Sequence, residues 1–336
     1  MAQPEHQQTR FAEKIARIRA GHYRLGDFMI ADAKDADLAG GITAMGQRRD
    51  ATGKIVGIRT RPEFHDQIRA LIKQDVLDIM LASTSTIETL THEGAFEGTR
   101  MLAAFRGNEA TDAWVGIRGG RYREYAPLPY RGAALELALA PICLYSLTYV
   151  NHAERDVASL EAYAHFRAQA RQQGLMHFLE VFNPNIDTGL CAADTPAYIN
   201  DCIIRMLASL THAERPEFLK VAYNGPDALE ELVTHDPSVV VGVLGGGQGT
   251  HRDTFELLAQ AERHGGRLAL FGRKINAAEH QPSMVSWMRR VVDRDTTPQA
   301  AVRGYHADLQ RLGITADRNL ATDSQITEDV LRADAQ

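Results

Sequence analysis

Residues 238–275, "SVVVGVLGGGQGTHRDTFELLAQAERHGGRLALFGRKI", contain two short apolar runs separated by one amphipathic stretch. The runs "SVVVGVL" and "RLALF" are rich in the branched and aromatic residues that strands favour. Between them, residues 253–266 place apolar side chains at helical spacing and end at glycine. This order predicts a strand, a crossover helix and a second strand parallel to the first.

The same alternation runs through the rest of the chain. Six further apolar runs precede this unit, and amphipathic stretches lie between many of them: 28–32, 77–82, 113–117, 142–150, 177–182 and 218–222. Eight such strands fit either a closed barrel or an open doubly wound sheet. We favour the barrel, because the count is eight and no GxGxxG-like turn follows the first run. The predicted fold class is α/β, a single-domain (β/α)8 TIM barrel.

The chain divides into three segments. Residues 1–25 are expected to form an N-terminal helical segment, residues 26–313 the barrel with its outer helices, and residues 314–336 a polar C-terminal tail. A helical stretch at 297–313 is expected to cover the outside or bottom of the barrel. The Gly-, Pro- and Tyr-rich stretch 118–139 is too long for a simple connection and predicts an active-site loop.

Composition narrows the class of protein. The 336 residues carry a net charge of −6, with 44% hydrophobic and 24% charged residues, which is ordinary for a soluble globular chain. No basic stripe interleaved with aromatics is present, so we expect no nucleic-acid partner. Cys143, Cys191 and Cys202 are odd in number and lack CxxC spacing, which argues against disulfides and zinc and fits a reducing cytoplasm. We see neither a signal peptide nor a membrane-spanning run.

The run "FLKVA" (218–222) carries a lysine in an apolar strand. Side chains alternate along a strand, so Leu219 and Val221 are expected to pack on helices and Lys220 to point into the barrel. Barrel active sites lie at the C-terminal strand ends, close to this position. Burial disfavours an ammonium, and a neutral amine can attack a carbonyl to form a Schiff base. The alternative left open is a lysine that reaches the rim or pairs with a carboxylate.

Glycines crowd the turn after the seventh strand, where four lie within residues 245–249. Such a turn exposes its backbone N–H groups and can wrap a phosphate. The eighth strand ends in Gly272 and Arg273, and an arginine offers a fork of donors to phosphate oxygens. The loops after strands seven and eight commonly hold phosphate in such barrels. The alternative is that these glycines only form tight turns.

Together, "FLKVAYNGP", "GVLGGGQG" and "LALFGRKI" resemble the last three strands of the class I, Schiff-base aldolase superfamily. The nearest members are the archaeal-type fructose-bisphosphate aldolases and the tagatose-bisphosphate and sulfosugar aldolases. The shared pattern is a strand-six lysine followed by a tyrosine, a glycine-rich strand-seven turn, and Gly-Arg closing strand eight. The resemblance covers about the C-terminal third of the chain. It implies that Lys220 is the Schiff-base lysine, that no cofactor or metal takes part, and that the phosphate is held by Gly245, Gly246, Gly247, Gly272 and Arg273.

A general acid/base is also required, because carbon–carbon cleavage moves a proton at a substrate hydroxyl. The relatives carry a first-strand aspartate and a carboxylate or tyrosine on strand five, which here points to Asp32 and Glu180. Asp32 alternatively caps the following segment, and Glu180 alternatively pairs with Arg118 or Arg205. We favour Glu180, because a carboxylate inside an apolar strand is costly unless it is used or paired.

The chain departs from the family pattern at three places. Phe182 stands near the point where archaeal-type aldolases place a strand-five tyrosine. The fourth strand lacks the second lysine of the tagatose-bisphosphate group and has Tyr145 and Tyr149 instead. Lys34 and Asp35 follow the first strand and are candidates for part of these roles. Lys34 is the main rival nucleophile, but its polar surroundings predict an exposed, protonated side chain.

The histidines do not predict a metal site. His177, His235, His251 and His264 are scattered and show no HxH or HExxH spacing, so we expect them at the surface or in packing.

The function expected is a class I aldolase that forms a Schiff base and cleaves a phosphorylated keto-sugar or a similar small carbonyl compound. A sulfonate could replace the phosphate. One alternative is a lysine-dependent acyl or aldol transferase, thiolase- or transaldolase-like. Another is a non-catalytic barrel that binds a phosphorylated metabolite. Barrels of this kind often associate through outer helices, so a homo-oligomer is expected.

Overall fold

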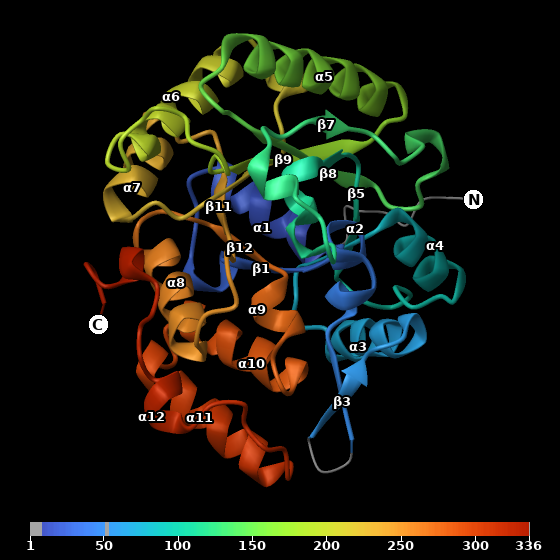
Figure 1. The fold of residues 1–336 in the computed structure, drawn as a ribbon, viewed down its shortest axis with the longest axis vertical. Coiled ribbons are helices and arrows are strands. Elements are labelled where there is room, and N and C mark those ends of the chain that lie inside the picture. Colours follow the sequence, from blue (N-terminus) through green and yellow to red (C-terminus); the bar gives the residue numbers. More distant parts are fainter. Residues whose placement is uncertain (1–8, 51–53, 336) are drawn as a thin grey trace.

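The computed structural model describes residues 9–50 and 54–335. Eight parallel strands close into a barrel in the order β1-β12-β11-β10-β9-β8-β5-β4, which confirms the predicted TIM barrel (Figure 1). The strands are β1 (Met29–Lys34), β4 (Ile79–Ala82), β5 (Leu102–Arg106), β8 (Ile142–Thr148), β9 (Met176–Phe182), β10 (Leu219–Val221), β11 (Val241–Leu244) and β12 (Leu268–Phe271).

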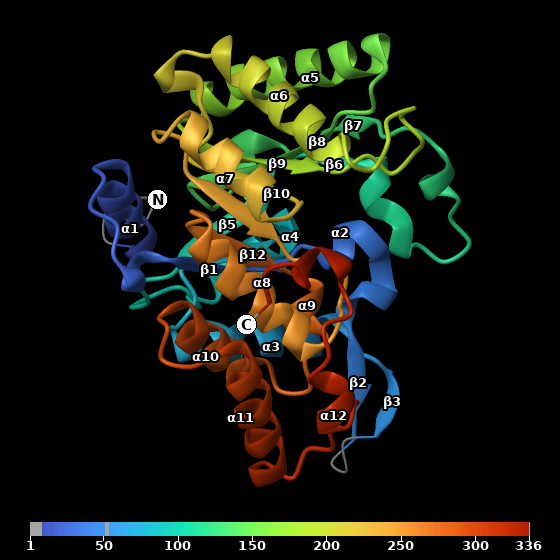
Figure 2. The same cartoon turned by 90° about the vertical axis from the view of Figure 1, so that its left-hand side faces the viewer.

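Helices surround the barrel (Figure 1). They are α3 (Arg61–Gln74), α4 (Thr84–His92), α5 (Ala153–Gln172), α6 (Thr195–Ala208), α7 (Pro226–His235), α8 (His251–Arg263), α9 (Arg273–Asn276) and α10 (Gln281–Val292). The expected C-terminal helix is α11 (Pro298–Arg311), which packs on α8 and α10 (Figure 2). None of the helices in the described ranges is long and apolar enough to cross a membrane.

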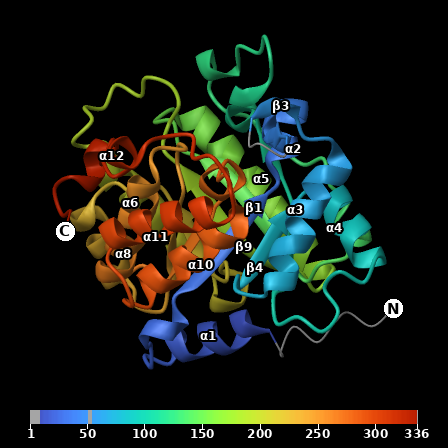
Figure 3. The same cartoon turned by 90° about the horizontal axis from the view of Figure 1, so that it is seen from below.

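Helix α1 (Arg10–Arg19) closes the N-terminal end of the barrel (Figure 3). The ring of Phe11 lies 5.9 Å from that of Phe218, at the start of the sixth barrel strand. Lys14 forms an ion pair of 2.8 Å with the buried Asp78, just before β4. Because this end is closed, access to the barrel interior comes from the opposite, C-terminal end.

Two apolar layers follow from the alternation of strand side chains. One fills the barrel and includes Ala31, Phe178 and Phe218. The other lies between the barrel and the helices and includes Ile30 and Leu219. Whether a polar side chain faces the cavity or the helix layer therefore depends on its parity within the strand.

The third barrel strand is not the predicted one. Residues 102–106 form β5, whereas residues 111–116 form a 3-10 helix, η4 (Thr111–Gly116). Within this helix Trp114 packs locally, with its ring 4.8 Å from Tyr122. The apolar residues of 113–117 therefore belong to a small local cluster and not to the barrel.

Residues 107–141 form a long excursion between β5 and β8. It contains η4, η5 (Tyr122–Glu124), η6 (Leu135–Leu137) and a short hairpin of β6 (Glu109–Ala110) with β7 (Pro129–Tyr130). Figure 2 shows this excursion on the side opposite α1, together with α2 (Ala36–Gly40) and the hairpin of β2 (Gln47–Arg49) with β3 (Ile55–Ile58). The excursion includes the stretch 118–139, for which an active-site loop is predicted, and it lies at the end of the barrel opposite α1 (Figure 2).

The C-terminal segment 314–335 packs against α8 and α9. It includes α12 (Leu320–Asp323) and η8 (Asp329–Leu331). Helix α8 begins with a capping box between Thr250 and Asp253, and Asp253 also accepts a hydrogen bond of 2.7 Å from the N–H of Thr327. Glu328 forms an ion pair of 2.8 Å with Lys274 in α9. These contacts fix the two helices that follow β11 and β12.

Candidate active site

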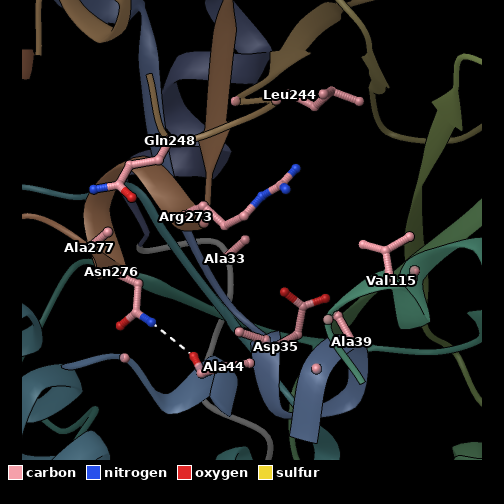
Figure 4. Close-up of a pocket in the computed structure, with 18 of the residues that line it drawn as sticks. Ala33, Asp35, Ala39, Ala44, Val115, Leu244, Gln248, Arg273, Asn276 and Ala277 are labelled. Carbon is pink, nitrogen blue, oxygen red and sulfur yellow. Dashed lines mark hydrogen bonds between the residues drawn. The ribbon is translucent and has the colours of Figure 1, made fainter. Parts of the chain in front are cut away.

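A cavity of about 650 Å³ opens at the C-terminal ends of the strands. Its lining comes from the barrel strands, from α2, α9 and the turns after β11 and β12, and from the 107–141 excursion. Figure 4 shows Asp35 and Arg273 extending into this space, and they follow the neighbouring strands β1 and β12. Position and size match those of small-molecule sites in TIM barrels.

Lys220 and Glu180 lie side by side on the inner face of the barrel. They are register partners on adjacent strands and share their faces with the inward-pointing Phe218 and Phe178. Lys220 is 5% exposed and Glu180 1%, and both line the cavity. The Lys220 ammonium forms an ion pair with Oε1 of Glu180. The amine and a potential proton acceptor are therefore already in contact.

Arg106 and Asp35 extend this pair into a buried network. The guanidinium of Arg106 donates to Asp35 Oδ2 at 2.5 Å, to Ser146 Oγ at 3.0 Å and to Glu180 Oε2 at 3.4 Å. Ser146 in turn donates to Glu180 at 2.8 Å. Burial alone would raise the pKa of Asp35, but the charges of Arg106 and Lys220 outweigh it and lower that pKa.

Sequence reasoning missed Arg106 and Ser146. Arg106 ends the strand that was not recognised, so nothing marked it as inward-facing. Ser146 lies on the inner face of β8, between the two tyrosines that the sequence suggested in place of a second lysine. Those tyrosines, Tyr145 and Tyr149, belong to the layer between barrel and helices and do not line the cavity.

Four of the five predicted anion-binding residues line the cavity: Gly245, Gly246, Gly272 and Arg273. Gly247 is exposed and is not part of the lining. The backbone of Gly246 has φ +62°, in the left-handed region that favours glycine. A Cβ at Gly272 would lie 2.9 Å from the carbonyl oxygen of Ala33, so the turn after β12 approaches β1 too closely for any other residue.

Arg273 reaches into the cavity from the first turn of α9 (Figure 4). Its guanidinium forms no ion pair and no hydrogen bond with another of the described residues. Burial, followed by the charge of Arg123, lowers the pKa of Arg273. An arginine in this state is suited to bind an anion from solution.

Asp32 and Lys34 lie on the other side of the barrel wall. Both point into the layer of helices, because they share the parity of Ile30 and not that of Ala31. Neither lines the cavity. The structure thus turns Asp32 away from the space where the sequence analysis expected it to act, and it is Asp35, three residues later, that faces this space.

The expectation of an exposed Lys34 was wrong. Its side chain is fully buried, forms an ion pair of 3.2 Å with Asp32 and donates to Gln281 at 3.0 Å. Burial lowers the pKa of Lys34 against the opposing charge of Asp32. Burial likewise raises the pKa of Asp32, to about 6. The partner Gln281 lies far along the chain, which is why the local sequence looked polar and open.

One histidine cluster lies outside the cavity. Within the described ranges, ligand-type atoms of His251, His306 and Asp323 lie within 4.8 Å of one another. His251 Nδ1 and His306 Nε2 are 2.5 and 2.8 Å from the same Asp323 oxygen, which are hydrogen-bond lengths. Burial would raise the pKa of Asp323, but the bonds from His251 lower it to about 2. The cluster fastens the C-terminal segment to α8.

The other histidines singled out in the sequence show ordinary contacts. His177 is buried and lies 2.8 Å from the hydroxyl of Tyr163. His264 lies 2.7 Å from both Glu230 and Asp334.

Comparison with known proteins gives a fold relationship and no closer kinship. No family model and no curated protein matches the chain. An archaeal fructose 1,6-bisphosphate aldolase aligns with a TM-score of 0.61 at 14% identity, over 84% of this chain and 99% of its own. Fructose-bisphosphate aldolase from Slackia heliotrinireducens aligns with a TM-score of 0.62 at 13% identity, over 92% and 94%.

A third solved structure is an archaeal fructose-1,6-bisphosphate aldolase with its catalytic lysine covalently bound to the carbinolamine intermediate of the substrate. It aligns with a TM-score of 0.60 at 15% identity, over 84% of this chain and 99% of its own. The chain is therefore similar in fold to Schiff-base aldolases along almost their entire length. The sequence identity is too low to indicate which substrate it binds.

Proposed function

We propose that this protein is a class I aldolase in which Lys220 forms a Schiff base with a phosphorylated keto compound. The observation that carries the proposal is the contact between the buried Lys220 amine and the Glu180 carboxylate, at the floor of a cavity whose rim holds Arg273. The fold likeness to Schiff-base aldolases supports the same reading.

The first step needs an uncharged amine. Glu180 takes the proton of Lys220 along their existing contact, and the amine nitrogen then bonds to the substrate carbonyl carbon. One of the two protons on the nitrogen passes to the carbonyl oxygen, which becomes the hydroxyl of a neutral carbinolamine. Glu180 returns a proton to this hydroxyl, which leaves as water and gives the protonated imine.

The second step breaks the bond between the third and fourth carbons. A base removes the proton of the hydroxyl on the fourth carbon, the aldehyde leaves, and the electron pair of the broken bond moves into the imine to form an enamine. We assign this base to Asp35, because its carboxylate faces the cavity and the charges of Arg106 and Lys220 keep it ionised. Asp32, on the helix side of the wall, has no part in this mechanism.

Phosphate binding positions the carbonyl against the amine. The glycine turn follows β11, the strand next to that of Lys220, and the Gly272–Arg273 turn follows β12, one strand further around the barrel. Binding energy from this remote group lowers the entropy cost of the reaction at the carbonyl. Nothing in this chemistry requires a metal.

Borohydride trapping tests the proposal. The protein is incubated with dihydroxyacetone phosphate, reduced and digested, and a mass increase is sought on the peptide that contains Lys220. A reduced adduct on that peptide supports the proposal. An adduct on another lysine, or none across a panel of keto-phosphates, contradicts it, and phosphate binding without any adduct favours the non-catalytic binder.

A transferase differs from an aldolase only after the enamine has formed. It passes the enamine to a second substrate, so turnover with a single keto-sugar phosphate favours the aldolase and strict dependence on an added acceptor favours the transferase. The cytoplasmic location and the homo-oligomeric state stay predictions, and a sizing column checks the latter.

A further inference from the structure

The 107–141 excursion brings a second arginine to the anion-binding end of the cavity. Arg123, in η5, lines the cavity together with Gly246 and Arg273 but comes from a different part of the chain. The excursion holds η5 through the ring of Tyr122, which contacts Trp114 edge-on. The position of Arg123 is thus determined by a packed element at the mouth of the barrel.

The carboxylate next to Arg123 in the sequence is already bound. Glu124 accepts hydrogen bonds of 3.0 and 2.9 Å from Nε of Arg121 and a third from its Nη2. Within the residues that the structure describes, Arg123 itself forms no ion pair and no hydrogen bond. A lone exposed arginine is common, so this alone assigns no role.

The relation between Arg123 and Arg273 is less common. Among the described residues that line the cavity, Arg123 and Arg273 have guanidinium groups with neither an ion pair nor a hydrogen bond, whereas Arg59 donates to the carbonyl oxygens of Met45 and Asn276. The charge of Arg123 also lowers the pKa of Arg273. The negative charge of Glu328 opposes this lowering, but Glu328 already pairs with Lys274 at 2.8 Å. Two like charges kept together without a counter-charge repel each other, and an anion between them removes that repulsion.

The number of charges on the ligand then matters. Two guanidinium groups and the free N–H of the glycine turn give a phosphate dianion a full set of charge-assisted partners. A sulfonate carries a single negative charge and gains less from the second arginine. Arg273 and the glycine turn can bind either a phosphate or a sulfonate. Arg123 would add a preference for the phosphate.

We infer that Arg123 completes the anion subsite from the excursion and selects substrates with a phosphate dianion over those with a sulfonate. The inference rests on the proposed function, since it concerns the substrate of that same cavity. It assigns to the excursion a role in specificity, beyond covering the site.

The test compares the Arg123→Gln and Arg123→Lys variants with Arg118→Gln, a control on the same excursion whose arginine is exposed and does not line the cavity. For each protein, the concentration that half-saturates borohydride trapping is measured with three ketones: dihydroxyacetone phosphate, its sulfonate analogue and uncharged dihydroxyacetone. Thermal unfolding checks that each variant is folded.

The expected result is a rise of about ten-fold to one hundred-fold in the half-saturating concentration of the phosphate for Arg123→Gln, the range for loss of one charge-assisted hydrogen bond. The rise for the sulfonate should be smaller, and the uncharged ketone should not respond. Arg123→Lys should fall between, because it keeps the charge and loses the fork. Arg118→Gln should match the wild type.

An equal rise for phosphate and sulfonate, or no rise, overturns the inference while the trapped adduct still supports the aldolase. If no protein forms an adduct, the aldolase proposal fails, and calorimetric titration with inorganic phosphate tests the subsite by itself. Weaker phosphate binding by Arg123→Gln than by Arg118→Gln then supports the inference, and equal binding overturns it.

Discussion

Two buried lysine–carboxylate pairs stand on opposite faces of the same barrel wall, and only one of them borders the cavity. Lys220 and Glu180 face inward and are 5% and 1% exposed, while Lys34 and Asp32 face the helices and are both 0% exposed. The two pairs have the same chemistry and nearly the same burial. The difference between the pairs is access: of the two buried lysines, only Lys220 lies where a carbonyl compound in the cavity could reach it.

The residues bonded to each pair support the same distinction. The inner pair continues into Arg106 and Asp35, two further charges at the cavity. The outer pair continues into neutral amides, because Lys34 donates to Gln281 and to Asn276. Asn276 also donates to the carbonyl oxygen of Ala44 at 3.0 Å (Figure 4). The outer pair thus joins β1, α9 and α10 and serves the structure.

The largest expected effect on activity comes from replacing the lysine of each pair by methionine, one pair at a time. Lys220→Met should abolish the trapped adduct and lower kcat/KM by about 10⁴-fold or more, because the nucleophile is removed. Lys34→Met should keep the adduct and lower kcat/KM by less than about ten-fold, while it destabilises the fold by about 3–5 kcal/mol through an unpaired buried carboxylate. Trapping, turnover and urea unfolding on both variants measure this.

Lys73, which lies on the exposed side of α3, provides a control as Lys73→Met. It should leave both trapping and stability unchanged. An adduct that persists in Lys220→Met and disappears in a folded Lys34→Met would reverse the roles of the two pairs.

The next largest difference is expected between the effects on kcat of replacing the two carboxylates, Glu180 and Asp32. Glu180→Gln should lower kcat by about 10²- to 10⁴-fold, because the amide cannot accept the proton of Lys220. Asp32→Asn should change kcat far less, since its side chain does not border the cavity. Steady-state kinetics over a range of pH measures both, and equal losses in the two variants would show that the barrel wall does not separate their roles.

The inner pair could be predicted from the sequence because its strands are unambiguous. In "FLKVA" and "HFLEVF" large apolar residues mark both faces, so the parity of Lys220 and Glu180 follows from helix-facing leucine and valine. The eighth strand and its Gly272–Arg273 turn are equally clear. These elements supply the amine, one carboxylate and most of the anion-binding turn.

The outer pair and the third strand could not be predicted in the same way. In "MIADAK" the alanines are small enough for either face, so nothing local shows that Asp32 points outward. The strand "LAAFR" contains two alanines of low strand propensity and ends in Arg106, which resembles the start of a loop. The burial of Lys34 depends on Asn276 and Gln281, which follow more than two hundred residues later.

Replacing Lys34 and Asp32 together tests whether the outer pair acts as a structural unit, and the expected effect is on stability only. Lys34→Met alone leaves the buried Asp32 carboxylate unpaired, and Asp32→Leu alone leaves the buried Lys34 ammonium without its carboxylate. Each single variant should cost about 3–5 kcal/mol of unfolding free energy. The double variant should cost much less than the sum, because an apolar pair needs no counter-charge. Urea unfolding of the four proteins gives the coupling energy, and simple additivity of the two losses would contradict it.

The smallest expected effect is the pH dependence of stability that Asp32 confers. Burial raises its pKa in the folded state to about 6, above the value of 3.8 for the unfolded chain. Above pH 6 both states are ionised and the fold bears the full cost of the buried anion. Between pH 6 and about 4 the folded state binds the proton first, so stability rises as the pH falls.

Against the Asp32→Asn variant, which cannot titrate at this position, the wild type should therefore gain roughly 1–3 kcal/mol of unfolding free energy as the pH falls from 6 to 4, since one pKa unit corresponds to about 1.4 kcal/mol. Exposed Asp66, exchanged as Asp66→Asn, supplies a control without this gain. Unfolding curves at several pH values measure the difference. A gain of the opposite sign would mean that Lys34 holds Asp32 ionised in the fold, which would make the two pairs electrostatically alike and leave access to the cavity as their only difference.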